Sequence, residues 1–102
     1  MAPEQPATFN GKGIEAFSNY VMTNVKYPQE AVTKNYSGKS FVQFIVEKDG
    51  KVTEVKIVRS SGYKALDEEA MRVVKSPPMW SPAKDKGQLV KQAFTLPVVF
   101  KL

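Results

Sequence analysis

The chain of 102 residues contains neither cysteine nor histidine. Without cysteine there is no disulfide or thiolate metal site, and redox chemistry gives no information about the compartment. Without histidine the commonest general base and the commonest metal ligand are absent, which excludes hydrolase triads and most zinc sites. Long apolar runs are also missing, so neither a signal peptide nor a membrane span is expected in these residues. No cofactor is expected.

The chain does carry a surplus of basic residues: 15 Lys and Arg against 10 Asp and Glu, a net charge of +5. This balance fits either an anionic partner or a merely soluble basic surface. The basic residues are dispersed, and only Phe41 among the strand aromatics is predicted to point outward, so nucleic-acid binding is not expected. A hydrophobic content of 42% suffices for one small core.

The segment from Phe41 to Val58 predicts a β-hairpin. Asp49-Gly50 lies between alternating apolar residues and predicts a two-residue type I′ turn, which needs positive φ at both positions. One face of the hairpin is then apolar and has to be covered. The predicted apolar cross-strand pairs are Val42 with Ile57, Phe44 with Val55, and Val46 with Thr53.

Helical spacing occurs on both sides of this hairpin. Residues 1–13 are rich in Pro, Gly and polar residues and predict a flexible linker remnant, so the domain is expected to span 14–102. A helix is predicted from Ile14 to before Pro28, with Pro28 as the first residue of a second, short helix up to Asn35. A further helix is predicted over 66–76, and its buried stripe is Leu66, Ala70, Val73 and Val74.

Residues 88–102 alternate again and predict a third strand, in which Pro97 indicates an edge position or a bulge. The order of elements predicts an α+β fold: a three-stranded antiparallel sheet of order 2-1-3 with helices packed on one face. The third strand then has an unpaired side along 88–96. Such an edge either accepts another strand or is shielded by a loop or by dimerisation.

Catalytic constellations are weak, and the chain is not expected to be an enzyme. Asp67, Glu68 and Glu69 are explained by the helix dipole, which favours acidic residues in a first turn. The Ser60-Ser61-Gly62 sequence has no accompanying base and predicts a turn. Trp80 is either a ligand platform or a residue that closes the core, and the second interpretation is favoured.

The order and spacing of several short sequences resemble the C-terminal domain of the TonB family over residues 14–102. They are Tyr27-Pro28 before a short helix, the FVQFIVEKDGKV hairpin, Ser60-Ser61-Gly62, Trp80-Ser-Pro82-Ala-Lys, and Leu96-Pro97-Val-Val-Phe100. Ser40 departs from the resemblance, because an apolar strand residue is usual there, and it predicts frayed pairing near Gly38.

The resemblance implies the periplasmic domain of an energy transducer anchored in the inner membrane and driven by an ExbB/ExbD-type motor. Its partners would be TonB-dependent outer-membrane receptors, whose TonB box adds as a strand to the last strand. The implied contact residues are Lys91, Gln92, Ala93, Phe94 and Thr95, with a corner formed by Tyr27, Pro28 and Gln29. A TolA-like envelope-linking domain, a basic nucleic-acid or peptidoglycan binder, and a homodimer paired through the same edge remain alternatives.

Overall fold

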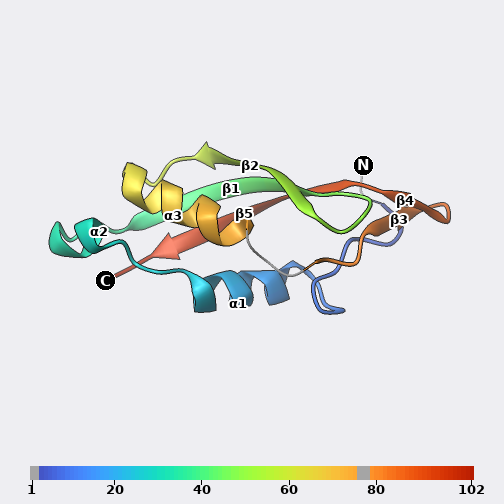
Figure 1. Cartoon of the computed structure of the whole chain (residues 1–102), viewed down its shortest axis with the longest axis horizontal. Coiled ribbons are helices and arrows are strands. Elements are labelled where there is room, and N and C mark those ends of the chain that lie inside the picture. The colour runs from blue at the N-terminus through green and yellow to red at the C-terminus, as the bar shows by residue number, and fades with distance from the viewer. Residues whose placement is uncertain (1–2, 76–78) are drawn as a thin grey trace.

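The computed structural model describes residues 3–75 and 79–102 of an elongated molecule. Its elements are α1 (Ile14–Asn24), α2 (Gln29–Thr33), β1 (Gly38–Val46), β2 (Val52–Arg59), α3 (Lys64–Lys75), β3 (Ala83–Asp85), β4 (Gln88–Val90) and β5 (Gln92–Phe100). They extend over 50 × 22 × 17 Å (Figure 1). Among the described residues no helix is long and apolar enough to cross a membrane.

The main sheet is antiparallel with the order β2-β1-β5, which confirms the predicted fold and strand order. Its inner face is the apolar face of β1 and β5, and α3 packs on β1 and β2 while α1 packs on β5. The predicted stripe of α3 is buried, as are Phe17 and Val21 of α1. The residues contributed by the strands are Val42, Phe44, Val46, Leu96, Val98 and Phe100.

The helix boundaries differ from the prediction by small amounts. α1 ends at Asn24, and the chain is extended at Val25 and again at Pro28, which is the N-cap of α2 and not its first residue. α3 begins at Lys64, two residues before the predicted start. The predicted final residue, Ser76, lies outside the described residues.

The turn between β1 and β2 is not the predicted two-residue type I′ turn. Only Gly50 has a positive φ, of 88°, and the loop holds one extra residue. The Glu47 N–H donates to the Lys51 carbonyl at 2.8 Å and the Gly50 N–H donates to the Glu47 carbonyl at 2.9 Å. A Cβ on Gly50 would lie 2.2 Å from the Trp80 carbonyl oxygen, so this loop is shaped by a distant contact.

The extra loop residue shifts the predicted hairpin pairs near the turn by one position. Val46 lies opposite Val52 and not opposite Thr53. A bulge at Glu54, whose φ is 49°, then absorbs the shift, so Val42 pairs with Ile57 as predicted. The bulge keeps Val55 and Ile57 of β2 packed against the core although the turn adds a residue.

A second, smaller sheet follows α3 where a loop was predicted. β3 and β4 form a hairpin, and its turn residues Lys86 and Gly87 both have positive φ, of 53° and 78°. This is the conformation of a type I′ turn. The predicted continuous strand from Gln88 is therefore divided at Lys91 into β4 and β5.

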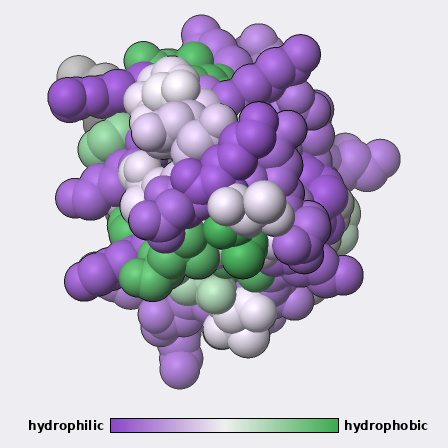
Figure 2. Space-filling view, turned by 90° about the vertical axis from the view of Figure 1, so that its left-hand side faces the viewer, coloured by the Kyte–Doolittle hydropathy of each residue, from purple (hydrophilic) through white to green (hydrophobic). Residues whose placement is uncertain are grey.

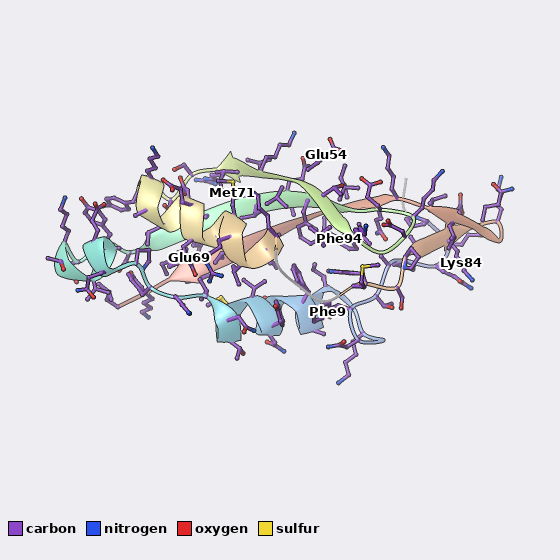
Figure 3. All side chains as sticks on the ribbon, viewed as in Figure 1. Phe9, Glu54, Glu69, Met71, Lys84 and Phe94 are labelled. Atoms are coloured by element: carbon purple, nitrogen blue, oxygen red, sulfur yellow. The ribbon has the colours of Figure 1, made fainter. Side chains whose placement is uncertain are left out.

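Residues 3–13 differ from the expected flexible linker, because they pack against the domain. Ala7 and Phe9 are only 2% and 1% exposed, and Thr8 exchanges backbone hydrogen bonds with Ser81. The Phe9 ring lies 5.5 Å from that of Trp80, which is itself buried as predicted. Figure 3 shows Phe9 beside the start of α1, where its ring lies 5.1 Å from that of Phe17.

Candidate functional site

The candidate site is the outer edge of β5. This strand pairs with β1 over its full length, from Gly38 opposite Phe100 to Val46 opposite Gln92, without a shift of register. On its other side no strand pairs with it within 3–75 and 79–102. Ala93, Thr95 and Pro97 are all exposed.

The register shows which backbone groups face this open edge. Backbone N–H and C=O groups of successive residues in an antiparallel strand point alternately to its two sides. The Glu47 N–H donates to Lys51, which places the backbone groups of Glu47 on the β2 side. Ile45, Gln43 and Phe41 follow on that side in steps of two. Their partners on β5 therefore turn their backbone groups to the open edge, and these are Ala93, Thr95 and Pro97.

Pro97 fits this arrangement. Proline has no N–H group, so it is tolerated in a strand where the missing donor would face solvent. The unbroken register of β5 across Pro97 agrees with that orientation and confirms the predicted edge position. The open edge therefore offers donors at Ala93, Thr95 and Val99, with a gap at Pro97.

The remaining predicted contact residues on this strand have other surroundings. Gln92 and Phe94 pair with β1, and the Phe94 ring lies 5.7 Å from Phe44 and 5.2 Å from Trp80. Phe94 therefore supports the edge from the inner face. Lys91 is exposed and lies between β4 and β5.

The predicted corner of Tyr27, Pro28 and Gln29 lies at the other end of β5. The Tyr27 hydroxyl donates to the Tyr36 carbonyl, and its ring stands edge-on to Phe100 at 5.6 Å. Phe100 is about 17 Å from Thr95 at roughly 3.3 Å per residue. The structure thus places both predicted contact regions along one strand but does not bring them together.

This end of the molecule has a mixed surface. Figure 2, which views it end-on, shows a hydrophobic patch surrounded by hydrophilic atoms. Val32 and Leu102 are exposed at this end. A groove of about 700 Å³ lies between the corner and α3, and its lining has as many basic as acidic residues. The groove therefore has no evident preference for ligands of either charge.

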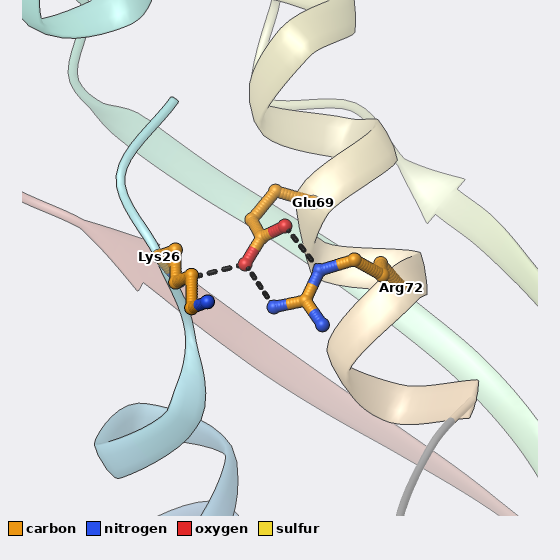
Figure 4. Close-up of polar contacts among 3 residues, drawn as sticks. All are labelled: Lys26, Glu69 and Arg72. Atoms are coloured by element: carbon orange, nitrogen blue, oxygen red, sulfur yellow. Dashed lines mark hydrogen bonds and ion pairs between the residues drawn. The ribbon is translucent and has the colours of Figure 1, made fainter. Parts of the chain in front are cut away.

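Glu69 attaches the corner to α3. It accepts a hydrogen bond from the Lys26 backbone N–H at 2.6 Å and two from the Arg72 guanidinium, at 2.6 and 2.7 Å (Figure 4). Burial raises the pKa of Glu69, but the hydrogen bonds from Arg72 and Lys26 outweigh it, so the pKa lies below its ordinary value. The carboxylate form thus holds the chain just before Tyr27.

The family of the chain is decided by comparison with known sequences. The sequence profile described as "Gram-negative bacterial TonB protein C-terminal" matches residues 23–102. The chain belongs to this family. Protein TonB of Helicobacter pylori is 29% identical over 77 residues, which are 76% of this chain and 26% of that protein. The chain therefore spans about a quarter of the length of this TonB relative.

Solved TonB C-terminal domains share the fold. An NMR structure of the Helicobacter pylori domain matches with a TM-score of 0.71 at 21% identity, covering 87% of this chain and 79% of the other. The Pseudomonas aeruginosa domain matches with a TM-score of 0.65 at 22% identity, covering 79% and 81%. At these identities the likeness shows the fold alone.

Asp67 is a structural residue of this TonB-family domain that the dipole interpretation missed. Its carboxylate accepts hydrogen bonds from the Ser40 hydroxyl at 2.7 Å, from the Ser61 N–H and hydroxyl at 2.9 Å each, and from the Ser60 hydroxyl. The predicted fraying near Gly38 is wrong, because Ser40 is fully buried and pairs with Val98. Burial raises the pKa of Asp67, but these hydrogen bonds outweigh it, so the pKa lies below its ordinary value.

Proposed function

We propose that this domain binds the TonB box of TonB-dependent outer-membrane receptors by adding it as a strand to β5. The observation that carries the proposal is the regular, exposed edge at which Ala93 and Thr95 present unpaired backbone groups. Main-chain hydrogen bonds recognise an extended peptide with little regard to its side chains. One domain could therefore serve several receptors.

The same edge accounts for the other predicted contact residues. A strand that starts beside Ala93 and continues along β5 reaches the corner at Tyr27, so both predicted contact regions would touch one peptide. The other predicted residues of this region, Lys91, Gln92 and Phe94, would flank the paired backbone groups. Phe94 would support the edge from the inner face of the sheet. Pro28 and Gln29, at the start of α2, would lie beside the peptide where it leaves the sheet.

In this proposal the domain is a periplasmic, non-catalytic part of an inner-membrane energy transducer. An ExbB/ExbD-type motor would act on the upstream region and the domain would transmit its pull to the receptor for nutrient import. A pull along a strand pair loads several hydrogen bonds together, so a main-chain attachment can carry force. The TonB relative is much longer than this chain, which is consistent with such an upstream region.

The direct test is to titrate a receptor TonB-box peptide into isotope-labelled protein and follow the amide signals. We expect the largest shifts at Ala93, Thr95 and Val99, with smaller ones near Tyr27. A scrambled peptide of the same composition is the control for charge. Shifts confined to β2 would overturn the proposal. It would also be overturned if a modest rise in salt concentration abolished binding, as it does for proteins that bind polyanions through charge.

A further inference from the structure

The β3–β4 hairpin has an open edge of its own, because no strand or isolated bridge among residues 3–75 and 79–102 pairs with the outer side of β4. The Lys84 N–H donates to the Gln5 carbonyl and the Gln5 N–H donates to the Lys84 carbonyl, both at 2.9 Å. Lys84 therefore turns its backbone groups toward the N-terminal segment and away from β4. Its neighbours in β3 face β4 instead, where Asp85 pairs with Gln88. By the same alternation Leu89 turns its backbone groups away from β3.

This edge is in phase with the open edge of β5. Gln88 and Val90 turn toward β3, and Gln92 turns toward β1, so the alternation is kept across Lys91. The Trp80 N–H donates to the Gly50 carbonyl at 2.9 Å, which sets the segment entering β3 against the end of the β1–β2 hairpin. Figure 1 shows β4 continuing the line of β5 to the end of the molecule.

Pro97 makes the two ends of this edge unequal as hydrogen-bond partners for a peptide. Donors follow one another without a proline from Leu89 to Thr95, whereas the half of β5 beyond Thr95 is interrupted at Pro97. A peptide that uses main-chain bonds therefore finds its longest unbroken ladder toward β4. From Leu89 to Val99 the edge is about 33 Å long at roughly 3.3 Å per residue.

We propose that the strand-accepting edge continues from β5 through Lys91 into β4 and takes a longer extended peptide than β5 alone could pair. The end of that peptide over β4 would carry an apolar side chain, because Leu89 is 46% exposed and gains from being covered. This inference rests on the proposed function, and it names the length and the chemistry of the partner segment.

The test compares one short peptide with two long peptides that contain the same receptor TonB box. The short one reaches only β5, and the long ones are extended at either end with residues that finish on valine. We expect one long peptide to bind about threefold to tenfold more tightly than the short one, the range expected for one or two added hydrogen bonds with apolar cover. That peptide should protect the Leu89 amide from hydrogen exchange.

Leu89→Pro removes the outward donor at β4 while leaving the β3-facing groups of Gln88 and Val90, and Leu89→Thr is the matched control that keeps the donor. Leu89→Pro should abolish the advantage of the long peptide without changing the affinity of the short one. Equal affinities of short and long peptides for the unaltered protein, with no protection of the Leu89 amide, would overturn the extension and leave strand addition at β5 intact.

Two further outcomes are decisive. If neither peptide binds, the proposed function fails together with this inference. The unaltered protein could instead form dimers in which the Leu89 amide is protected from hydrogen exchange and added peptide does not bind beside it. The edge would then pair with a second copy of the chain, and the inference would be wrong. Amide exchange on the unaltered protein settles these cases even where Leu89→Pro does not fold.

Discussion

The two edges of the main sheet differ in regularity. β2 has two register shifts against β1, and the bulge residue Glu54 has a φ of 49°. β5 keeps one register with β1 along all nine residues. Bulges and charged side chains hinder the docking of another strand, whereas a flat regular edge invites it. The comparison indicates that the β2 edge hinders the addition of another strand, whereas the β5 edge allows it.

The side chains reinforce this difference. Lys56 and Arg59 are exposed on β2, with the Arg59 guanidinium 5.8 Å from the centre of the Phe41 ring. Figure 3 shows Glu54 on the outer side of β2, away from β5. Along β5 the exposed residues are the small or uncharged Ala93, Thr95 and Pro97.

The largest expected effect comes from the support under β5. Phe9→Ala should lower the free energy of unfolding by about 3 to 5 kcal/mol, because a fully buried aromatic ring is removed from the cluster that includes Trp80. Chemical denaturation measures the loss. Hydrogen exchange should rise more in β4 and β5 than in β2. Phe9→Leu is the milder control, and an unchanged stability of Phe9→Ala would show that residues 3–13 are not part of the core.

The next effect separates the two edges directly. Ala93→Pro should weaken binding of a receptor peptide about threefold to tenfold, because it removes one edge donor and leaves the pairing of Gln92 and Phe94 with β1. Calorimetric titration measures the affinity. Ala93→Val keeps the donor and should bind as the unaltered protein does. Equal binding by a folded Ala93→Pro protein would speak against strand addition here.

A gain is expected from the reverse change. Pro97→Ala would supply the missing donor on the open edge and should tighten peptide binding about twofold to fivefold. It should also raise the tendency to self-associate, because proline protects an edge from other chains. Sedimentation and titration measure the two effects. Pro97→Ala with neither effect would mean that no partner strand pairs with the edge beside Pro97.

The bulge of β2 allows a smaller test. Glu54→Gly should raise the free energy of unfolding by about 0.5 kcal/mol, because glycine adopts a positive φ without the strain of a side chain. Peptide affinity should stay the same, since β2 is not the binding edge. A loss of peptide binding in Glu54→Gly would reverse the assignment of the two edges.

Periodicity predicted the elements that bury a whole face. The stripe of α3 and the alternation in β1 and β5 repeat often enough to identify helix and strand, and the order of elements then placed β1 at the centre. Short elements were missed, because β3 and β4 have three residues each and show no period. The composition of residues 1–13 concealed Ala7 and Phe9 among polar neighbours.

Features set by distant contacts could not be predicted locally. The Asp49-Gly50 sequence is typical of a type I′ turn, but the packing of Trp80 on Gly50 selects a longer loop. Glu69 accepts a hydrogen bond from the backbone of Lys26, 43 positions away in sequence. The candidate edge followed from the strand order, whereas the choice of Ala93 and Thr95 over Gln92 and Phe94 needed the register.

The last test concerns the end of the sheet where β2 leads into α3. The pKa of Asp67 is lowered in the folded protein, so its hydrogen bonds stabilise the fold fully above the ordinary pKa near 3.8 and are lost as the pH falls through the lower, folded value. Unfolding followed between pH 6 and pH 2 should show this loss. Asp67→Asn should lower stability at neutral pH and flatten the acid dependence. Hydrogen exchange at low pH should increase first around Ser40 and Ser61, while the Ala93 end of β5 stays protected from unfolding. If acid instead opens both ends together, the two edges are not independently supported.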